Sequence, residues 1–411
     1  MALGCRSCTV KQTLKQMRLP LRFAYRGISV VAVSVAALCL SNPTEAQVVF
    51  TNLGFGSATR VSDDGTVVVG SSLESGVFRW TAATGKVVPN GLEGLYDSGA
   101  FVSGDGSVMA GEGLNFKPDS GAYRWTESGG KMSLGGLPGT TSFYARGMSG
   151  DGSTIVGDGR TVPITAVRWT AQSGTVGLGT LGGGESHAYA VSQDGSVVTG
   201  VSALANGTER AFRWTEADGM ISIGTIGGAW SLGEAINSNG SIIAGTLFHP
   251  ATFTRDSFLW SADTGMIPLG IFPGYLNNVA RGLSDDGSIV IGGADNGYGY
   301  IWTPESGIRD FSSVLYEDYG IADQLAGWEK ITPFGITPDG RYLVGSGMYD
   351  EHVSAWLLDR GLTPPPIAEG PPLGPSPFPP VPEPSTYGVF ASFLLLGIIG
   401  WRRRANSKAK A

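Results

Sequence analysis

The chain has 411 residues, of which 64 are glycine and 42% are hydrophobic, so it has enough apolar side chains for a packed core. Residues 47–380 carry 17 Lys and Arg against 33 Asp and Glu, a net charge of −16, whereas both ends are basic. This charge argues against nucleic acid as a partner, because such affinity depends on Lys and Arg displacing counterions from phosphates. Its three cysteines (Cys5, Cys8 and Cys39) precede the cleavage site expected below, so the mature chain has no disulfide, structural zinc or thiol nucleophile.

Residues 1–46 have the three parts of a secretory signal peptide. Basic residues from Lys11 to Arg26 precede an apolar run over 28–40, and the small-residue site Thr44-Glu45-Ala46 follows. Thirteen residues are too few for a stable membrane-spanning helix. We therefore expect export and cleavage after Ala46, with Met17 as an alternative start of translation.

The body of the chain consists of one motif that occurs seven times. A turn dipeptide recurs at intervals of 41 to 53 residues: Asp64-Gly65, Asp105-Gly106, Asp151-Gly152, Asp194-Gly195, Asn239-Gly240, Asp286-Gly287 and Asp339-Gly340. A tryptophan follows each turn: Trp80, Trp125, Trp169, Trp214, Trp260, Trp302 and Trp356. Two independent markers with one period and one count indicate a repeat architecture.

Each unit predicts four short strands. In residues 187–227, apolar or alternating segments flank Asp194-Gly195, for which we expect a type I′ hairpin turn. Four strands in about 45 residues is the spacing of a propeller blade. Helical periodicity is suggested only for Ile321–Trp328.

The ends of the array favour a closed ring. Residues 48–54 look like a fourth strand with no unit before them, and the last unit ends after Leu358 without a fourth strand. Pairing of these two ends would remove the free edges. We predict an all-β, seven-bladed β-propeller over residues 47–361, closed by its N-terminal strand, with an open β-solenoid as the alternative.

The repeats resemble a known family. The segments LGTLGGGES (178–186), RAFRWTEADGM (210–220) and AINSNGSIIAG (235–245) are similar to the HAF family of extracellular repeats. The namesake His-Ala-Phe triplet is not intact, since Arg210 replaces its histidine in the best copy. The resemblance implies an exported repeat protein and no particular chemistry.

Repeated aromatic–Arg–Trp triplets, such as Phe78-Arg79-Trp80 and Phe212-Arg213-Trp214, favour packing between sheets over a ligand site. We expect their arginines to pair with turn aspartates of the same or an adjacent blade. The non-repeating insert Asp310–Lys330 holds Tyr316, Tyr319 and Trp328, which we take as the best candidates for an exposed contact surface.

No catalytic or cofactor-binding constellation is visible. His187, His249 and His352 lie in different units without zinc spacing or a nucleophile–base pattern. The acidic pairs Asp63-Asp64 and Asp285-Asp286 offer two ligands each where Ca²⁺ needs six to eight, so a hairpin turn is the preferred interpretation and Ca²⁺ the lesser one. Carboxylates converging from separate blades onto the centre of the ring, as for glycoside hydrolysis, cannot be located from sequence.

The C-terminal part divides into a Pro-rich linker over 362–380 and a sorting segment over 381–411. Val381, Pro382, Glu383 and Pro384 precede an apolar run over 387–401, and Arg402, Arg403 and Arg404 follow it. This order resembles the PEP-CTERM signal of Gram-negative bacteria, which implies membrane insertion of the run and processing by an exosortase. At about 22 Å of helix the run is short for a bilayer core of ~30 Å, which suits a transient anchor.

These observations predict an exported cell-surface or extracellular protein with a non-enzymatic interaction or matrix role. Its expected partners are the secretion machinery and exosortase during processing, and exopolysaccharide or other envelope components afterwards; it meets the membrane only through the C-terminal segment. The alternatives are a secreted propeller glycoside hydrolase or lyase and a purely structural envelope protein.

Overall fold

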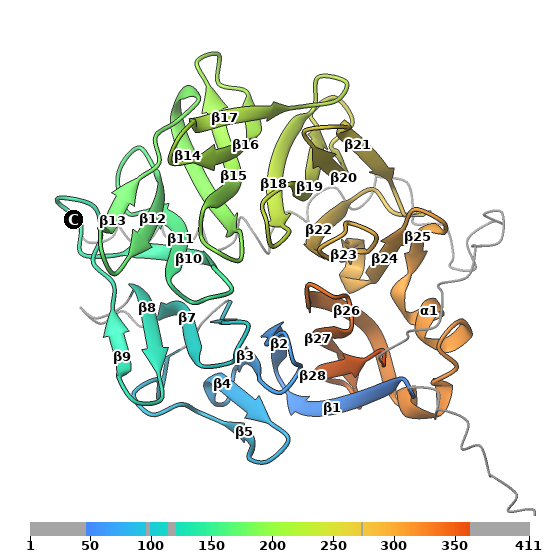
Figure 1. Cartoon of the computed structure of the whole chain (residues 1–411). Coiled ribbons are helices and arrows are strands. Elements are labelled where there is room, and N and C mark those ends of the chain that lie inside the picture. Colours follow the sequence, from blue (N-terminus) through green and yellow to red (C-terminus); the bar gives the residue numbers. More distant parts are fainter. Residues whose placement is uncertain (1–46, 96–98, 114–120, 273, 362–411) are drawn as a thin grey trace, which may run out of the picture. The chain divides into compact units, whose positions relative to one another are not determined.

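A computed structural model describes residues 47–95, 99–113, 121–272 and 274–361 as seven four-stranded antiparallel sheets arranged in a ring (Figure 1). The expected signal peptide, the linker and the sorting segment with its transmembrane run lie outside these residues. Within the described part of the chain, no helix has the length and apolar character needed to cross a membrane.

The sheets follow one another along the chain. In the first six, the strand nearest the centre of the ring comes first in sequence, and in the seventh that strand is β26, while the N-terminal β1 is outermost (Figure 1). The first three sheets are β2 (Ser57–Val61), β3 (Val68–Ser72), β4 (Gly76–Thr81), β5 (Gly85–Val87); β6 (Phe101–Val102), β7 (Val108–Gly113), β8 (Gly121–Thr126), β9 (Gly130–Ser133); and β10 (Phe143–Met148), β11 (Thr154–Gly159), β12 (Ala166–Thr170), β13 (Gly174–Gly177). The next three are β14 (Gly182–Val191), β15 (Val197–Leu204), β16 (Glu209–Thr215), β17 (Gly219–Gly224); β18 (Trp230–Ile236), β19 (Ile242–His249), β20 (Thr254–Ser261), β21 (Gly265–Gly270); and β22 (Asn278–Leu283), β23 (Val290–Ala294), β24 (Gly299–Thr303), β25 (Gly307–Asp310). The seventh sheet comprises β26 (Trp328–Ile336), β27 (Tyr342–Tyr349), β28 (His352–Asp359) and the N-terminal β1 (Val49–Phe55).

The seventh sheet confirms the predicted closure. Strand β1 pairs antiparallel with β28, from Val49 opposite Asp359 to Phe55 opposite Ser354. The ring of Phe50 stacks on Trp356 at 5.4 Å, so burial of an aromatic pair adds to the backbone ladder. The open solenoid is therefore the wrong alternative.

A glycine in the second strand of each sheet explains the shape of the inner strand. A Cβ on Gly200 would lie 1.9 Å from the carbonyl oxygen of His187, and a Cβ on Gly245 would lie 1.9 Å from that of Leu232. Without side chains at these points, the inner strand can bulge toward its neighbour. The same approach, at 1.8 to 2.2 Å, is found at Gly70, Gly157, Gly200, Gly245, Gly292 and Gly345. The buried Phe212 and Phe258 sit opposite Gly200 and Gly245 on the third strands and cover them.

The recurring turn is longer than the two-residue loop of a type I′ hairpin, because the amide of Ser192 donates to the carbonyl of Val197, and that prediction is wrong. In the fourth sheet only Gly195 has a positive φ (+74°), while Asp194 does not. The amide of Gly195 donates to the carbonyl of Ser192, and the Ser192 hydroxyl donates to Asp194 while accepting from the amide of Val197. The side chains of Ser192 and Asp194 thus satisfy the turn from inside, as serine and aspartate commonly do.

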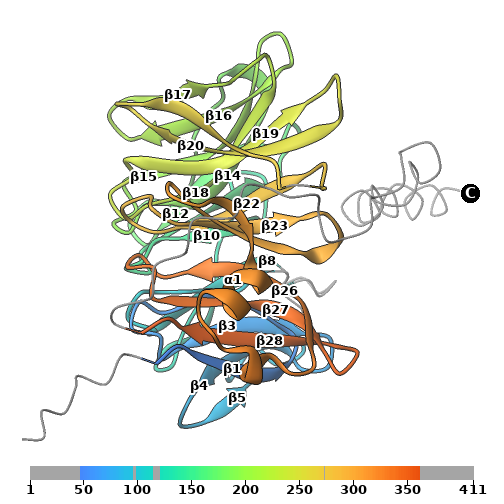
Figure 2. The ribbon, with the colours of Figure 1, turned by 90° about the vertical axis from the view of Figure 1, so that its right-hand side faces the viewer.

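The insert before β26 packs against β24, β25 and β26. Figure 2 shows its helix beside β26. Its α-helix α1 (Phe311–Glu317) begins at Asp310, whose side chain accepts from the amide of Ser313. The helix predicted over residues 321–328 is wrong. Gly320 precedes that segment and Gly327 lies within it, both at positive φ, which leaves room only for the 3₁₀ turn η2 (Ala322–Leu325).

Candidate functional site at the centre of the ring

The two ends of the ring differ. We call the end that carries the seven recurring turns the hairpin end, and the opposite end, where the inner strands begin, the open end. At the hairpin end, neighbouring turns are joined by backbone hydrogen bonds, as from Asp63 to Gly104 (2.8 Å) and from Gly104 to Gly150 (2.7 Å). The amide of Gln193 crosses from the fourth sheet to the carboxylate of Asp63 in the first (3.1 Å). Gln193 therefore fills the middle of the hairpin end, and a Cβ on Gly150 would collide with it at 2.1 Å.

Above this end, each innermost strand carries one residue at an equivalent position, and in six blades that residue lies at a bulge. In six sheets the inner-strand register shifts around a single residue, and Ala100 holds the equivalent position in the second sheet. We call the set the axial ring; its members are Thr59, Ala100, Arg146, Tyr189, Glu234, Arg281 and Phe334. Because a bulged residue leaves the ladder, its side chain is free to face away from the neighbouring sheet. Ala100 is the exception, because it has no bulge and is fully buried among Val67, Val69 and Met109.

Glu234 and Arg281 are two charged members of the axial ring that interact electrostatically and have shifted pKa values. Burial raises the pKa of Glu234 to about 7, against the opposing effects of a hydrogen bond from Thr246 and the charges of Arg281 and Arg255. Arg281 is an exposed residue, but its guanidinium lies 4.6 Å from the centre of the Phe334 ring, and partial burial lowers its pKa against the opposing charge of Glu234. In the described part of the chain, Arg281 makes no ion pair. An exposed guanidinium on an aromatic face, without a carboxylate partner, can bind an anion.

In the third and fourth blades, Arg146 and His187 already have a carboxylate partner. Arg146 donates to Asp158 (3.1 Å), and the Nδ1 atom of His187 lies 3.2 Å from the other oxygen of that carboxylate. Burial lowers the pKa of His187, but the Asp158 carboxylate more than offsets this and leaves the pKa raised. Because the Asp158 carboxylate already pairs with Arg146 and His187, these two cations form a weaker anion site than Arg281.

The axial ring was not predicted from the sequence, although a signal was present. When the repeats are aligned on their turns, the axial residue lies three positions before the Ser, Thr or Asn that opens the turn. In four of the seven repeats both its neighbours are small, as in Ala188-Tyr189-Ala190 and Gly233-Glu234-Ala235, while the residue itself differs in almost every repeat. A variable residue between small ones at a fixed repeat position marks a bulge that faces the centre.

The repeated triplets confirm packing and correct the expected ion pairs. Phe78, Tyr123 and Phe212 are fully buried. The triplet arginines reach the next blade, but they donate to the backbone carbonyl of the turn glycine and not to an aspartate. Arg124 bonds to Gly152 (3.0 Å) and Arg213 to Gly240 (3.3 Å), because the aspartates already accept hydrogen bonds within their own turns.

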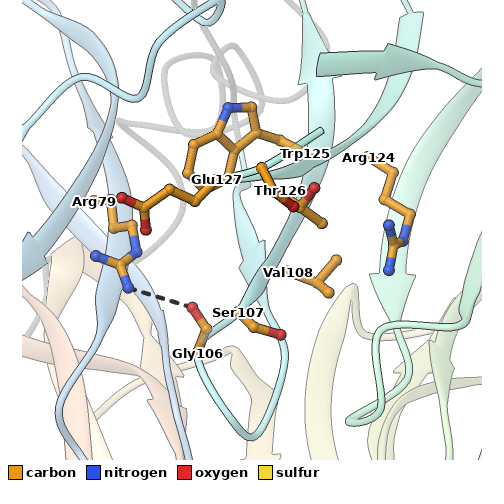
Figure 3. A pocket seen from close by; sticks show the side chains of 9 residues that line it. Arg79, Gly106, Ser107, Val108, Arg124, Trp125, Thr126 and Glu127 are labelled. Atoms are coloured by element: carbon orange, nitrogen blue, oxygen red, sulfur yellow. Dashed lines mark hydrogen bonds between the residues drawn. The ribbon is translucent and has the colours of Figure 1, made fainter. Parts of the chain in front are cut away.

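A cleft of about 480 Å³ lies at the junction of the first two blades, where one of these triplet arginines crosses. Figure 3 shows Arg79 donating to the carbonyl of Gly106 (3.4 Å) beside the carboxylate of Glu127, with Trp125 above and Arg124 turned away. Trp125 is itself almost fully buried. The cleft is thus bounded by groups that join the blades, which makes it a poorer candidate site than the axial ring.

The predicted contact surface is corrected. Tyr316 is 43% exposed, but Tyr319 and Trp328 are only 8% and 7% exposed. The hydroxyl of Tyr319 accepts from Arg360 (2.7 Å), and Trp328 packs edge-on against Phe50 (5.2 Å). Trp328 thus packs on the closing strand β1 and Tyr319 on the residue that follows β28, so neither presents a surface.

The acidic turns offer no cation cage. In the described residues, no group of three or more His, Cys, Asp or Glu is arranged to hold a metal ion. Asp285 accepts from the amide of Ser238 (2.7 Å) and Asp286 from the Ser284 hydroxyl (2.6 Å), so protein donors occupy these carboxylates. Burial raises the pKa of Asp63, which further disfavours a charged ligand pair there.

Comparisons with known proteins support the fold and no more. No protein-family model matches the chain, and no curated protein matches its sequence. The oligogalacturonate lyase of Vibrio parahaemolyticus is similar in structure, with a TM-score of 0.52 and 11% identity over 78% of this chain and 100% of that one. A putative TolB of Agrobacterium tumefaciens (TM-score 0.40, 18% identity, 55% of this chain and 88% of that one) and TolB of Acinetobacter baumannii (0.38, 15%, 54% and 54%) follow.

Proposed function

We propose that this chain is an exported propeller that binds a carboxylated polysaccharide of the cell envelope at its axial ring, without altering it chemically. The proposal of export depends on the signal peptide and the sorting segment, and the proposal of a polysaccharide on the resemblance of that segment to PEP-CTERM signals. Arg281 is the single observation that carries the binding site. Arg281 is an exposed residue and makes no ion pair in the described part of the chain, although that part is rich in carboxylates.

Calorimetric titration of the purified full chain with polygalacturonate and with neutral dextran tests this proposal. We expect polygalacturonate to bind and dextran not to bind. The Arg281→Gln variant should lose about 10- to 100-fold in affinity, since a charge-assisted hydrogen bond contributes roughly 1.5–3 kcal/mol. Arg168→Gln, which changes an arginine outside the axial ring, is the control. Equal affinity of wild type and Arg281→Gln, or equal binding of the two polymers, would overturn the proposal.

A second candidate function is a polysaccharide lyase, and the pKa of Glu234 favours it. A carboxyl with a pKa of about 7 is half ionised at neutral pH and can take up or release a proton. In a lyase, a base takes the proton from the carbon beside the sugar carboxylate, a carbon–carbon double bond forms, and the glycosidic oxygen leaves with a proton. The propeller fold is compatible with such an activity, since the Vibrio structure of the same fold is named a lyase.

Absorbance of unsaturated products separates the two candidates in the same titration samples. Release of such products by wild type and its loss in Glu234→Gln would establish the lyase and refute the non-enzymatic role. Binding without any new absorbance or reducing ends would support the binding protein.

A further inference from the structure

Three aromatic side chains gather at the open end of the fifth sheet, and we call them the aromatic platform: Trp230, Phe248 and Phe253. Trp230 begins β18 and lies directly opposite Phe248 of β19, with ring centres 5.7 Å apart. Phe253 follows in the loop between β19 and β20, and its ring lies 6.3 Å from that of Phe248. The platform thus continues outward from the strand that carries Glu234.

Phe253 is the residue in this loop that stability alone does not explain. Its φ is +55°, in the left-handed region where glycine and asparagine are favoured and a bulky side chain is strained. Both Thr252 and Phe253 donate their amides to the carbonyl of His249, so the turn itself fixes this conformation. The ring is nevertheless 76% exposed, so it gains little from burial. Strain of this kind is often retained where a side chain serves a function.

The repeat does not require an aromatic residue at this place. In the fourth sheet the equivalent hairpin turns at Asn206 and Gly207, and Gly207 takes the positive φ. In the first sheet the equivalent loop carries Leu73, which is 92% exposed and has no ring. The platform is therefore a property of one blade and not of the fold.

Positive charge accompanies the platform. The guanidinium of Arg255 lies 5.6 Å from the centre of the Phe248 ring and is exposed. It makes no ion pair within the part of the chain that the structure describes. Its charge lowers the pKa of Glu234, so Arg255 stands within electrostatic reach of the axial ring. Arg255 and Arg281 both act on Glu234 through their charges, so two guanidinium groups lie within electrostatic reach of this carboxyl.

We infer that the aromatic platform is a second subsite for the carboxylated polysaccharide, whose chain runs from the axial ring over Phe253. The apolar C–H faces of sugar rings carry a slight positive charge, which suits the negative face of an aromatic ring. A sugar carboxylate matches the fork of Arg255. This inference rests on the proposed function, because it needs a ligand that also reaches Arg281.

The test compares a short and a long ligand, galacturonate dimer and polygalacturonate, on the full chain. Phe253→Asn removes the ring and suits the backbone, because asparagine tolerates a positive φ, so the variant is expected to fold as well as wild type. Its affinity for the polymer should fall about 5- to 10-fold, as expected for loss of an aromatic contact of ~1 kcal/mol, while that for the dimer stays unchanged. Leu73→Asn, an exposed apolar residue of the equivalent loop, is the matched control.

The outcomes distinguish the two proposals. If wild type binds neither ligand, the proposed function itself fails. If wild type binds the polymer and Arg281→Gln weakens that binding, but Phe253→Asn binds it as wild type does, the platform is refuted alone. A gain of affinity with ligand length that survives in Phe253→Asn would also refute the platform.

Discussion

The hairpin end and the open end of the ring are made from the same seven repeats, yet they differ in almost every respect. At the hairpin end, each blade repeats one turn in which a Ser, Thr or Asn meets an Asp or Asn, and neighbouring turns bond to each other. Above that end, the axial residues differ from blade to blade, and at the open end one loop holds a strained phenylalanine. The lesson is that repetition builds the scaffold, while departures from the repeat mark the surface on which ligand chemistry can develop.

The largest effect should come from the glycines that permit the bulges. Gly200→Ala places a Cβ 1.9 Å from a carbonyl oxygen, which forces the inner strand away and displaces Tyr189. We expect a loss of about 3 kcal/mol or more in the free energy of unfolding, measured by denaturant titration. Gly184→Ala is the control, because nothing lies within 4 Å of its added Cβ, and it should change stability by no more than about 0.5 kcal/mol. Equal effects of the two variants would contradict the steric explanation of the bulge.

A smaller, pH-dependent effect should come from Glu234 in the axial ring. Its pKa is raised from 4.5 to about 7, so the unfolded chain ionises this carboxyl more easily than the folded one does. Its stabilising contribution is therefore complete below about pH 4.5 and declines as the pH rises to about 7. Relative to Glu234→Gln, wild type should lose about 1–3 kcal/mol across this window, as measured by thermal unfolding at several pH values. A constant difference between the two proteins from pH 4 to 8 would refute the raised pKa.

The smallest effect should separate two arginines at the same repeat position. Arg213 donates to Gly240 of the next blade, whereas the Nε atom of Arg168 is buried without a hydrogen-bond partner. Arg213→Leu should cost about 0.5–1.5 kcal/mol in the free energy of unfolding, and Arg168→Leu should be neutral or slightly stabilising. A cost that is the same for both variants would show that these arginines act through packing alone.

The repeated features of this fold could be predicted from the sequence, whereas the features that depend on close contacts in space could not. Turn dipeptides and tryptophans repeat with one period, so the sequence predicts seven blades. The unpaired segments at the two ends of the array also predict the closing strand. The bulge could not, because it depends on how closely the carbonyl of His187 approaches Gly200, which is a three-dimensional fact. The burial of Tyr319 and Trp328 also escaped prediction, since their partners Arg360 and Phe50 are distant in sequence.

The insert has a function that an exposed surface would not have. The side-chain amide of Gln324 accepts from the amide of Phe50 (2.7 Å) and donates to the carbonyl of Val48 (3.1 Å). It therefore occupies backbone groups on the outer edge of β1, where another chain would otherwise pair. An insertion that looked like a binding element in sequence thus protects the edge strand.

Closure by β1 has a mechanical consequence. Strand β28 leads directly to Gly361, and it is hydrogen-bonded along one edge to β1 and along the other to β27. Tension applied to the fold from its C-terminal side would have to shear two ladders at once, since no edge strand is available there to peel away bond by bond. A protein held at a surface through that side would be fastened by one of its most firmly embedded strands.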